Sequence, residues 1–146
     1  MSETGNPIVE YRNLIEAEDA VGFELLFPAI LRPDFKRISV IDNKILEVLL
    51  PFDMVYRMAR GAEDISGIHQ NFPEVWESLD SSYKLTEKGA SGRVHVATWI
   101  HGQFTFSFYS PGSISHGEIS QMVTCMKQIG RFRPGNVTFS AEAEED

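Results

Sequence analysis

The chain has 146 residues, of which 42% are hydrophobic and 23% are charged. These fractions are typical of a globular protein and exclude an intrinsically disordered one. The formal net charge of −8 belongs to the two ends, because residues 1–20 and the tail at 141–146 each carry −4. Without a concentrated positive surface, strong binding to nucleic acid is not expected.

The cellular setting follows from what the sequence lacks. A single cysteine, Cys125, excludes an internal disulfide and gives no sign of an oxidising compartment. No apolar run approaches the roughly 18 residues of a membrane span, and the start of the chain does not resemble a signal peptide. We therefore expect a soluble, cytoplasmic protein without a transmembrane segment. Peripheral membrane contact has no support in the sequence.

The N-terminal part is expected to be helical after a short disordered start. Residues 1–8 contain breakers of regular structure and predict disorder. Residues 9–20 have apolar side chains at helical spacing, and Gly22 follows as a helix stop. The apolar segment 23–27, closed by a proline, predicts buried extended chain.

A first β-hairpin is predicted over residues 35–50. Two apolar segments, 35–41 and 44–50, flank the pair Asp42 and Asn43, whose side chains tolerate the positive φ of a tight turn. A helix over 43–50 is the alternative, since Leu, Glu and Lys favour helices. We prefer the hairpin.

Two further helices are expected in the middle of the chain. Pro51 is suited to the first turn of a helix over 52–60. Pro73 in the same way predicts a short helix over 74–79. Residues 87–92 are rich in small residues and are expected to form a flexible connection to the next element.

The main hairpin is predicted over residues 92–110. If the turn is His101-Gly102, residues whose numbers sum to 203 face each other, so that Trp99 lies opposite Phe104. One face then carries a tryptophan and three phenylalanines and is expected to be core. The other face is mixed, and its apolar members are expected to be partly exposed: Val94, Val96, Ile100 and Tyr109.

The helix after this hairpin, predicted over 116–129, has the clearest local signals. Ser115 and Glu118 have the spacing of a capping box, apolar residues recur at helical spacing, and Gly130 is suited to the stop position. A final strand is expected over 136–140. Together these elements predict one α+β domain over 9–140, with an antiparallel sheet of about four to six strands packed by amphipathic helices and an acidic tail at 141–146.

No catalytic motif, metal site or cofactor site is evident. The four histidines lack the spacing of a metal pair, and no nucleophile elbow, phosphate loop or dinucleotide fingerprint is present. His95 lies on the aromatic face and is expected to be a core histidine. Cys125 lies next to methionines in the predicted helix and is expected to be a small buried hydrophobe rather than a nucleophile.

Two short segments are candidates for binding a partner, in addition to the mixed sheet face. Tyr11 and Leu14 have the Tyr-x-x-Leu spacing of a linear motif, although an amphipathic helix explains the same residues. A cluster of cations around one aromatic residue follows the last helix, and it either complements the helix C-terminus or binds an anion or acidic partner: Lys127, Arg131, Phe132 and Arg133.

The leading functional hypothesis is a non-enzymatic protein-interaction or assembly module that binds a protein partner or self-associates. One form of it is a small viral matrix-like or accessory structural protein. A second form is an inhibitor or immunity-type protein whose acidic ends cover a basic target. The alternative from another class is a small hydrolase or transferase that uses His95.

Overall fold

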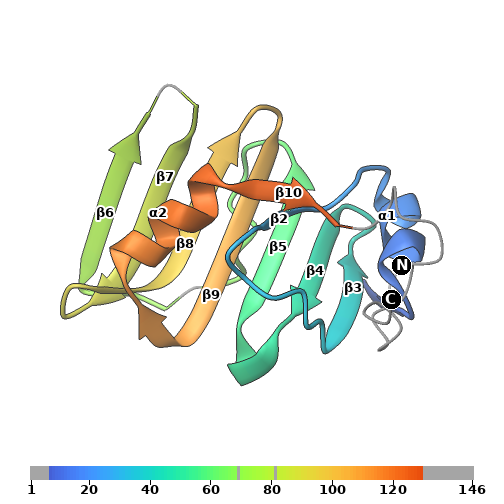
Figure 1. Cartoon of the computed structure of the whole chain (residues 1–146), viewed down its shortest axis with the longest axis horizontal. Coiled ribbons are helices and arrows are strands. Elements are labelled where there is room, and N and C mark those ends of the chain that lie inside the picture. The colour runs from blue at the N-terminus through green and yellow to red at the C-terminus, as the bar shows by residue number, and fades with distance from the viewer. Residues whose placement is uncertain (1–6, 69, 81, 130–146) are drawn as a thin grey trace.

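The computed structural model describes residues 7–68, 70–80 and 82–129. An eight-stranded sheet dominates these residues, with every neighbouring pair antiparallel (Figure 1). The spatial order is β1-β3-β4-β5-β9-β8-β7-β6. The strands are β1 Ile8–Tyr11, β3 Arg37–Ile41, β4 Ile45–Leu49, β5 Val55–Arg60, β6 Glu74–Leu79, β7 Lys84–Ala90, β8 Arg93–His101 and β9 Phe104–Ile114. The predicted α+β class is confirmed, but the sheet is larger than four to six strands.

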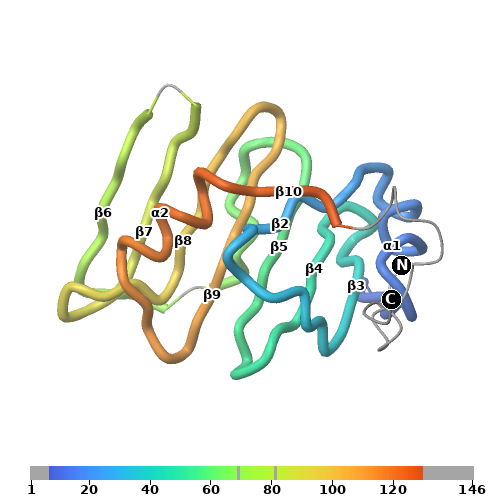
Figure 2. The backbone as a smooth tube through the Cα atoms, viewed as in Figure 1, coloured from blue at the N-terminus to red at the C-terminus, as the bar shows by residue number. Residues whose placement is uncertain are grey.

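The remaining elements cover one face of this sheet (Figure 2). Two short helices, α1 Leu14–Val21 and α2 His116–Thr124, pack against it. Between them lies a small ladder of β2 Leu26–Pro28 and β10 Met126–Gln128. The short 3-10 turn η1 Pro51–Asp53 precedes β5. None of the helices in the described ranges is long and apolar enough to cross a membrane.

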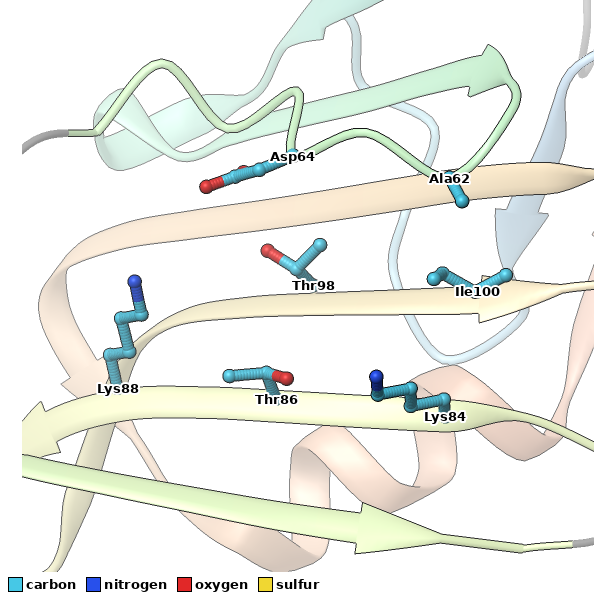
Figure 3. Close-up of a pocket in the computed structure, with 7 residues that line it drawn as sticks. All are labelled: Ala62, Asp64, Lys84, Thr86, Lys88, Thr98 and Ile100. Carbon is cyan, nitrogen blue, oxygen red and sulfur yellow. The ribbon is translucent and has the colours of Figure 1, made fainter.

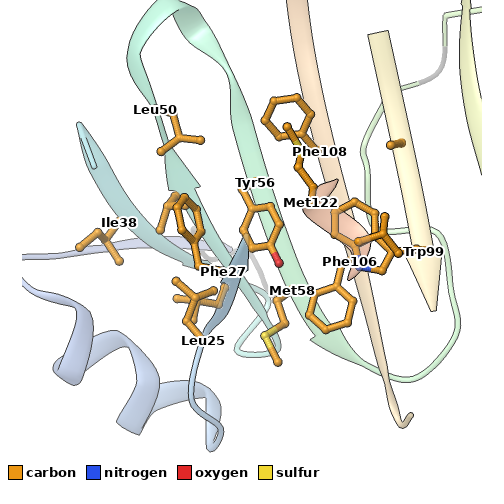
Figure 4. Packing of buried hydrophobic residues seen from close by; sticks show 14 of the residues in the cluster. Leu25, Phe27, Ile38, Leu50, Tyr56, Met58, Trp99, Phe106, Phe108 and Met122 are labelled. Carbon is orange, nitrogen blue, oxygen red and sulfur yellow. The ribbon is translucent and has the colours of Figure 1, made fainter. Parts of the chain in front are cut away.

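The core lies between the sheet and this covering layer (Figure 4). Trp99 and Phe106 are fully buried and stack with their ring centroids 5.6 Å apart. The hydroxyl of Tyr56 donates to the carbonyl oxygen of Leu26 at 2.6 Å, which links β5 to β2. Burial raises the pKa of the Tyr56 phenol well above its usual value, because the charged form loses its hydration.

The main hairpin differs from the prediction in its register. Trp99 lies opposite Phe106 rather than Phe104, and the turn residues are Gly102 and Gln103. Gly102 takes the positive φ of 63° that the turn requires. Because the register differs by two residues, the side chains from Val96 to the turn keep their predicted faces. The hairpin over 35–50 is confirmed, and Asp42 and Asn43 both have positive φ.

Two residues near a β-bulge in β8 are buried, although they were predicted to be partly exposed. Val94 pairs with Gly89 and Val96 pairs with Lys88, so His95 is the additional residue between them. The bulge moves Val94 into the core cluster, where it is 1% exposed, and Val96 is also buried, at 3%. The expectation that these two valines are exposed is therefore wrong.

Three predicted helices are wrong wholly or in part. Residues 55–60 and 74–79 form β5 and β6, because in each segment alternate side chains face the covered side of the sheet. At the N-terminus, β1 begins at Ile8 and the helix begins only after Asn13, whose side chain accepts from the amide of Glu16. Gly22 ends this helix as predicted, with φ of 86°.

The last predicted helix begins as expected and ends early. The capping box between Ser115 and Glu118 is present in both directions. The helix stops at Thr124, so Met126 belongs to β10. Cys125 is exposed at the helix end, which corrects the expectation that it is buried. Gly130, the strand over 136–140 and the tail lie outside the described residues.

Candidate functional site

The main candidate site is an open groove between α2 and the β6–β7 hairpin. Its volume of about 530 Å³ lies within the range of roughly 300–1,000 Å³ that is usual for ligand sites. Figure 1 shows α2 in front of β7 and β8, with β6 beside it at the edge of the sheet. The groove is lined by Trp76, Glu77, Ser78, Tyr83, Leu85, Glu87, His116 and Ser120.

Pairing of the two strands positions the floor of this groove. Trp76 lies opposite Glu87, and Ser78 lies opposite Leu85. Because side chains alternate along a strand, Trp76 and Ser78 share the covered side of the sheet with Leu85 and Glu87. His116 is the first residue of α2 and reaches the same floor from above.

The central interaction of the groove joins Glu87 to His116. The Oε1 atom of Glu87 lies 3.1 Å from Nδ1 of His116. The ring of Trp76 meets the imidazole edge to face, with centroids 4.4 Å apart. Only 6% of the Glu87 side chain is exposed, whereas 40% of the His116 side chain is exposed. The carboxylate is therefore a buried group reached from the groove.

The second carboxylate oxygen of Glu87 is unsatisfied. Oε2 is buried and has no hydrogen-bond partner among the described residues. A buried acceptor of this kind costs about 1–3 kcal/mol, and more when it is charged, unless a donor reaches it. Glu87, which lines the groove, thus has one buried carboxylate oxygen with free acceptor capacity.

A second hollow continues along α2 from this groove. Its volume is about 430 Å³, and it shares Tyr83 with the groove. His101 lies at its wall, with Nδ1 2.7 Å from the carbonyl oxygen of Ser82. The other lining residues are Leu26, Asp80, Ser82, Val123, Thr124 and Met126. The covered side of the sheet therefore has adjacent hollows on either side of Tyr83.

The opposite face of the sheet carries a smaller hollow, shown in Figure 3. The connection from β5 to β6 crosses this face, where Ile65 packs on Ile45 and Ala59. Below it, alternate residues of β7 and β8 form a hollow of about 210 Å³. It is lined by Ala62, Asp64, Lys84, Thr86, Lys88, Thr98 and Ile100. This volume is below the usual range for a ligand site.

The structure separates the sequence-predicted binding residues. Val94 and Val96 are buried, whereas Ile100 and Tyr109 are half-buried on the second face. Tyr11 lies in β1, opposite Ile38 on β3.

The two short segments do not form a common site with that face. Tyr11 belongs to the strand β1, whereas Leu14 is buried in the helix α1. The amphipathic helix expected over 9–20 therefore does not contain both residues. Lys127 is exposed on β10. Its predicted neighbours Arg131, Phe132 and Arg133 lie outside the described residues.

The groove was not predicted from the sequence, because other elements were expected in the two segments that form its floor. Trp76 was placed in a helix and Glu87 in a flexible connection. Neither EVWESL nor KLTEKGA has the strict alternation of apolar and polar residues that reveals a half-buried strand, so the sequence carried no clear signal for either one. His95, the candidate for the enzyme hypothesis, stacks on Phe72, and its Nδ1 lies 3.0 Å from the carbonyl oxygen of Ser110.

No group of three or more metal-ligating side chains comes together within residues 7–68, 70–80 and 82–129. Comparison of the chain with models of protein families, with curated proteins and with solved structures finds no match.

Proposed function

We propose that the protein is an interaction module that binds an extended segment of a partner protein as an additional strand along β6. The observation that supports this most directly is the open outer side of β6. This strand ends the eight-stranded sheet, and no other strand in the described part of the chain pairs with that side. Strand addition at such an edge is a common mode of peptide recognition.

The direction of the backbone groups supports this proposal. The amide of Asp80 donates to the carbonyl oxygen of Tyr83 at 2.9 Å, which marks a hydrogen-bonded position of the β6–β7 ladder. Such positions alternate along an antiparallel pair. Trp76 and Ser78 therefore bond towards β7, and the N–H and C=O groups of the other alternate residues point outward: Val75, Glu77 and Leu79.

The side chains along this edge offer contacts on both faces. Leu79 is 83% exposed and Val75 is 54% exposed, both on the face opposite α2. Trp76 is half-buried on the other face, at the groove. An added strand would contact the valine and leucine with one set of its alternate side chains and the groove with the other.

Charge favours a basic partner over a second copy of this chain. β6 carries Glu74 and Glu77, and Asp80 follows it. Pairing two copies of β6 would bring these carboxylates together, and like charges on paired strands are destabilising. The chain as a whole has a net charge of −8. The opposite edge strand, β1, is shorter, with four residues against six.

The test uses three synthetic peptides with the full-length protein. One alternates lysine with valine, the second has glutamate in place of lysine, and the third is the first with alternate backbone amides methylated. We expect the first to bind, measured by fluorescence anisotropy, and the other two to bind at least about tenfold more weakly, because one lost set of hydrogen bonds or one charge reversal exceeds 1.4 kcal/mol. Equal binding of the methylated peptide, or binding of none, contradicts strand addition to β6 by a basic segment.

A matched pair of variants locates the binding to β6. Glu77→Pro removes an outward amide and is tolerated at a sheet edge. Glu77→Thr removes the same charge and keeps the amide. We expect the proline variant to lose about tenfold more affinity for the lysine peptide than the threonine variant does. Equal affinities would place the peptide elsewhere.

A further inference from the structure

We infer that the groove between α2 and the β6–β7 hairpin is a binding site for an ammonium or guanidinium group, with Oε2 of Glu87 as its acceptor. The inference deepens the proposed function and rests on it in one respect. A lysine or arginine of the added strand is one source of the cation, and a free small amine is the other.

The buried carboxylate of Glu87 lacks a full set of hydrogen-bond donors among the described residues. Glu87 is 5% exposed and lies in a row between Ala97 on β8 and Trp76 on β6. The ion pair found for it within the described residues is with His116, which is charged only when protonated. Its Oε2 atom receives no hydrogen bond there. A buried carboxylate of this kind is stabilised when a cationic donor approaches.

The residues that line the groove are suited to a cation. Glu87 is the lining carboxylate that strand alternation places on the groove side of the sheet, and neither lysine nor arginine of the described ranges lines the groove. Trp76 and Tyr83 supply aromatic rings, which attract a cation at their faces by about 0.5–2 kcal/mol. The hydroxyls of Ser78 and Ser120 supply further acceptors. This combination favours a cation over an anion or an apolar ligand.

A strand added to β6 would lie within reach of Glu87 on β7 for a long side chain. Neighbouring strands of a sheet lie about 4.8 Å apart, so a strand added to β6 would lie about 10 Å from β7. On the covered side, the residue next to Trp76 would join the cross-strand row of Trp76, Glu87 and Ala97, with Trp76 between it and Glu87. Only the long side chains of lysine and arginine span such a distance to a glutamate, and they carry the required charge.

The experiment measures binding of n-butylammonium, methylguanidinium and the lysine–valine peptide to the full-length protein by calorimetry. The neutral control ligand is n-butanol. Glu87→Gln keeps the shape of the side chain and removes its charge. Glu77→Gln is the matched control, because it removes one exposed charge from the neighbouring strand β6 on the face of the sheet away from α2. We expect Glu87→Gln to weaken binding of at least one cationic probe about tenfold or more, and Glu77→Gln to weaken it less than about threefold.

A second measurement does not depend on a variant. In the wild-type protein, the side-chain carboxyl carbon resonance of Glu87 is expected to shift on titration with the bound cation and to stay unchanged with n-butanol. This keeps the inference testable if Glu87→Gln fails to fold. A cation that binds without moving this resonance would overturn the inference.

The outcomes separate the two sources and the two proposals. Binding of the small cations through Glu87, with no peptide binding, supports the site and rejects strand addition. Binding of the peptide alone, weakened by Glu87→Gln, identifies a partner's side chain as the source. In a third outcome, no small cation binds, and the peptide binds more weakly to Glu77→Pro than to Glu77→Thr but equally well to wild type and Glu87→Gln. This outcome overturns the inference and leaves the proposed function standing.

Discussion

Gly89 lies so close to Arg93 that a Cβ atom built on Gly89 would be 1.9 Å from the carbonyl oxygen of Arg93. This contact occurs beside the bulge at which β7 changes its register with β8. Real Cβ atoms do not approach a backbone oxygen so closely, and the backbone oxygen is not free to rotate away. The position therefore requires glycine for steric reasons.

We expect Gly89→Ala to lower the free energy of unfolding by about 2–3 kcal/mol, because overpacking forces the backbone to shift. Gly92→Ala, in the turn that follows β7, is the matched control. Gly92 has φ of 75° with nothing within 4 Å of an added Cβ, so its cost is limited to about 1–2 kcal/mol of backbone strain. Urea unfolding of both variants measures the difference. A larger loss at Gly92 would contradict the steric argument.

The buried phenol of Tyr56 predicts an alkaline loss of stability. Its pKa is raised in the folded state, so the unfolded state releases the proton first as the pH rises. The free energy of unfolding is then expected to fall by about 1.4 kcal/mol per pH unit above about pH 10 on account of this group. Tyr56→Phe should remove this part of the slope. Unfolding curves between neutral and strongly alkaline pH test this, with Tyr109→Phe as the control.

At neutral pH, Tyr56→Phe has a separate cost. The variant leaves the carbonyl oxygen of Leu26 without the hydrogen bond of 2.6 Å that it accepts from Tyr56. We expect a loss of about 1–3 kcal/mol in the free energy of unfolding. An unchanged stability at neutral pH together with an unchanged alkaline slope would contradict both statements.

Arg57 is expected to hold the connection from β5 to β6 on the sheet. Its guanidinium contacts the carboxylate of Glu47 at 2.8 Å and donates to the carbonyl oxygen of Ile65 at 2.9 Å. Arg57→Met leaves a largely buried carboxylate and a carbonyl without donors, and we expect a loss of about 2–3 kcal/mol. Hydrogen exchange of residues 62–67 should accelerate, whereas exchange in α2 should not. Restoration of part of the stability by a second change, Glu47→Gln, is the expected control.

The cap of α2 is expected to position the histidine of the groove. Ser115 accepts from the amide of Glu118 at 3.1 Å, and His116 follows directly after it. Ser115→Ala should cost about 1 kcal/mol in the free energy of unfolding. It should also increase the mobility of the His116 ring over Trp76, which NMR relaxation of the imidazole would show. Ser113→Ala, outside the helix, serves as the control and should leave the ring unaffected.

Turn and capping residues in the sequence correctly predicted the first hairpin and the start of α2. The turn at Asp42 and Asn43 has positive φ and forms the expected hairpin, and the capping box begins α2 at the expected residue. The register of the main hairpin was wrong by two residues, because several adjacent residues are suited to the turn. The faces were nevertheless correct between Val96 and the turn, since a shift of two preserves them, whereas the bulge at His95 places Val94 on the core face.

The errors arose where distant parts of the chain decide the structure. Residues 55–60 and 74–79 include good helix formers after a proline, yet pairing with β9 and β7 makes them strands. The groove could not be predicted for the same reason. Glu87 is a site residue only because β6 places Trp76 and α2 places His116 beside it, and no local pattern in the sequence indicates that arrangement.

The strand order has a consequence for how the chain reaches this structure. Apart from the excursion to α1 and β2, strands β1 to β5 are neighbours in chain order, and so are β6 to β9. The two halves meet along the β5–β9 ladder, with β2 and β10 forming a second junction above it. A cut in the connection between β5 and β6 would thus yield two fragments with complementary apolar edges. Their reassociation on mixing would reveal whether the halves fold first and dock afterwards.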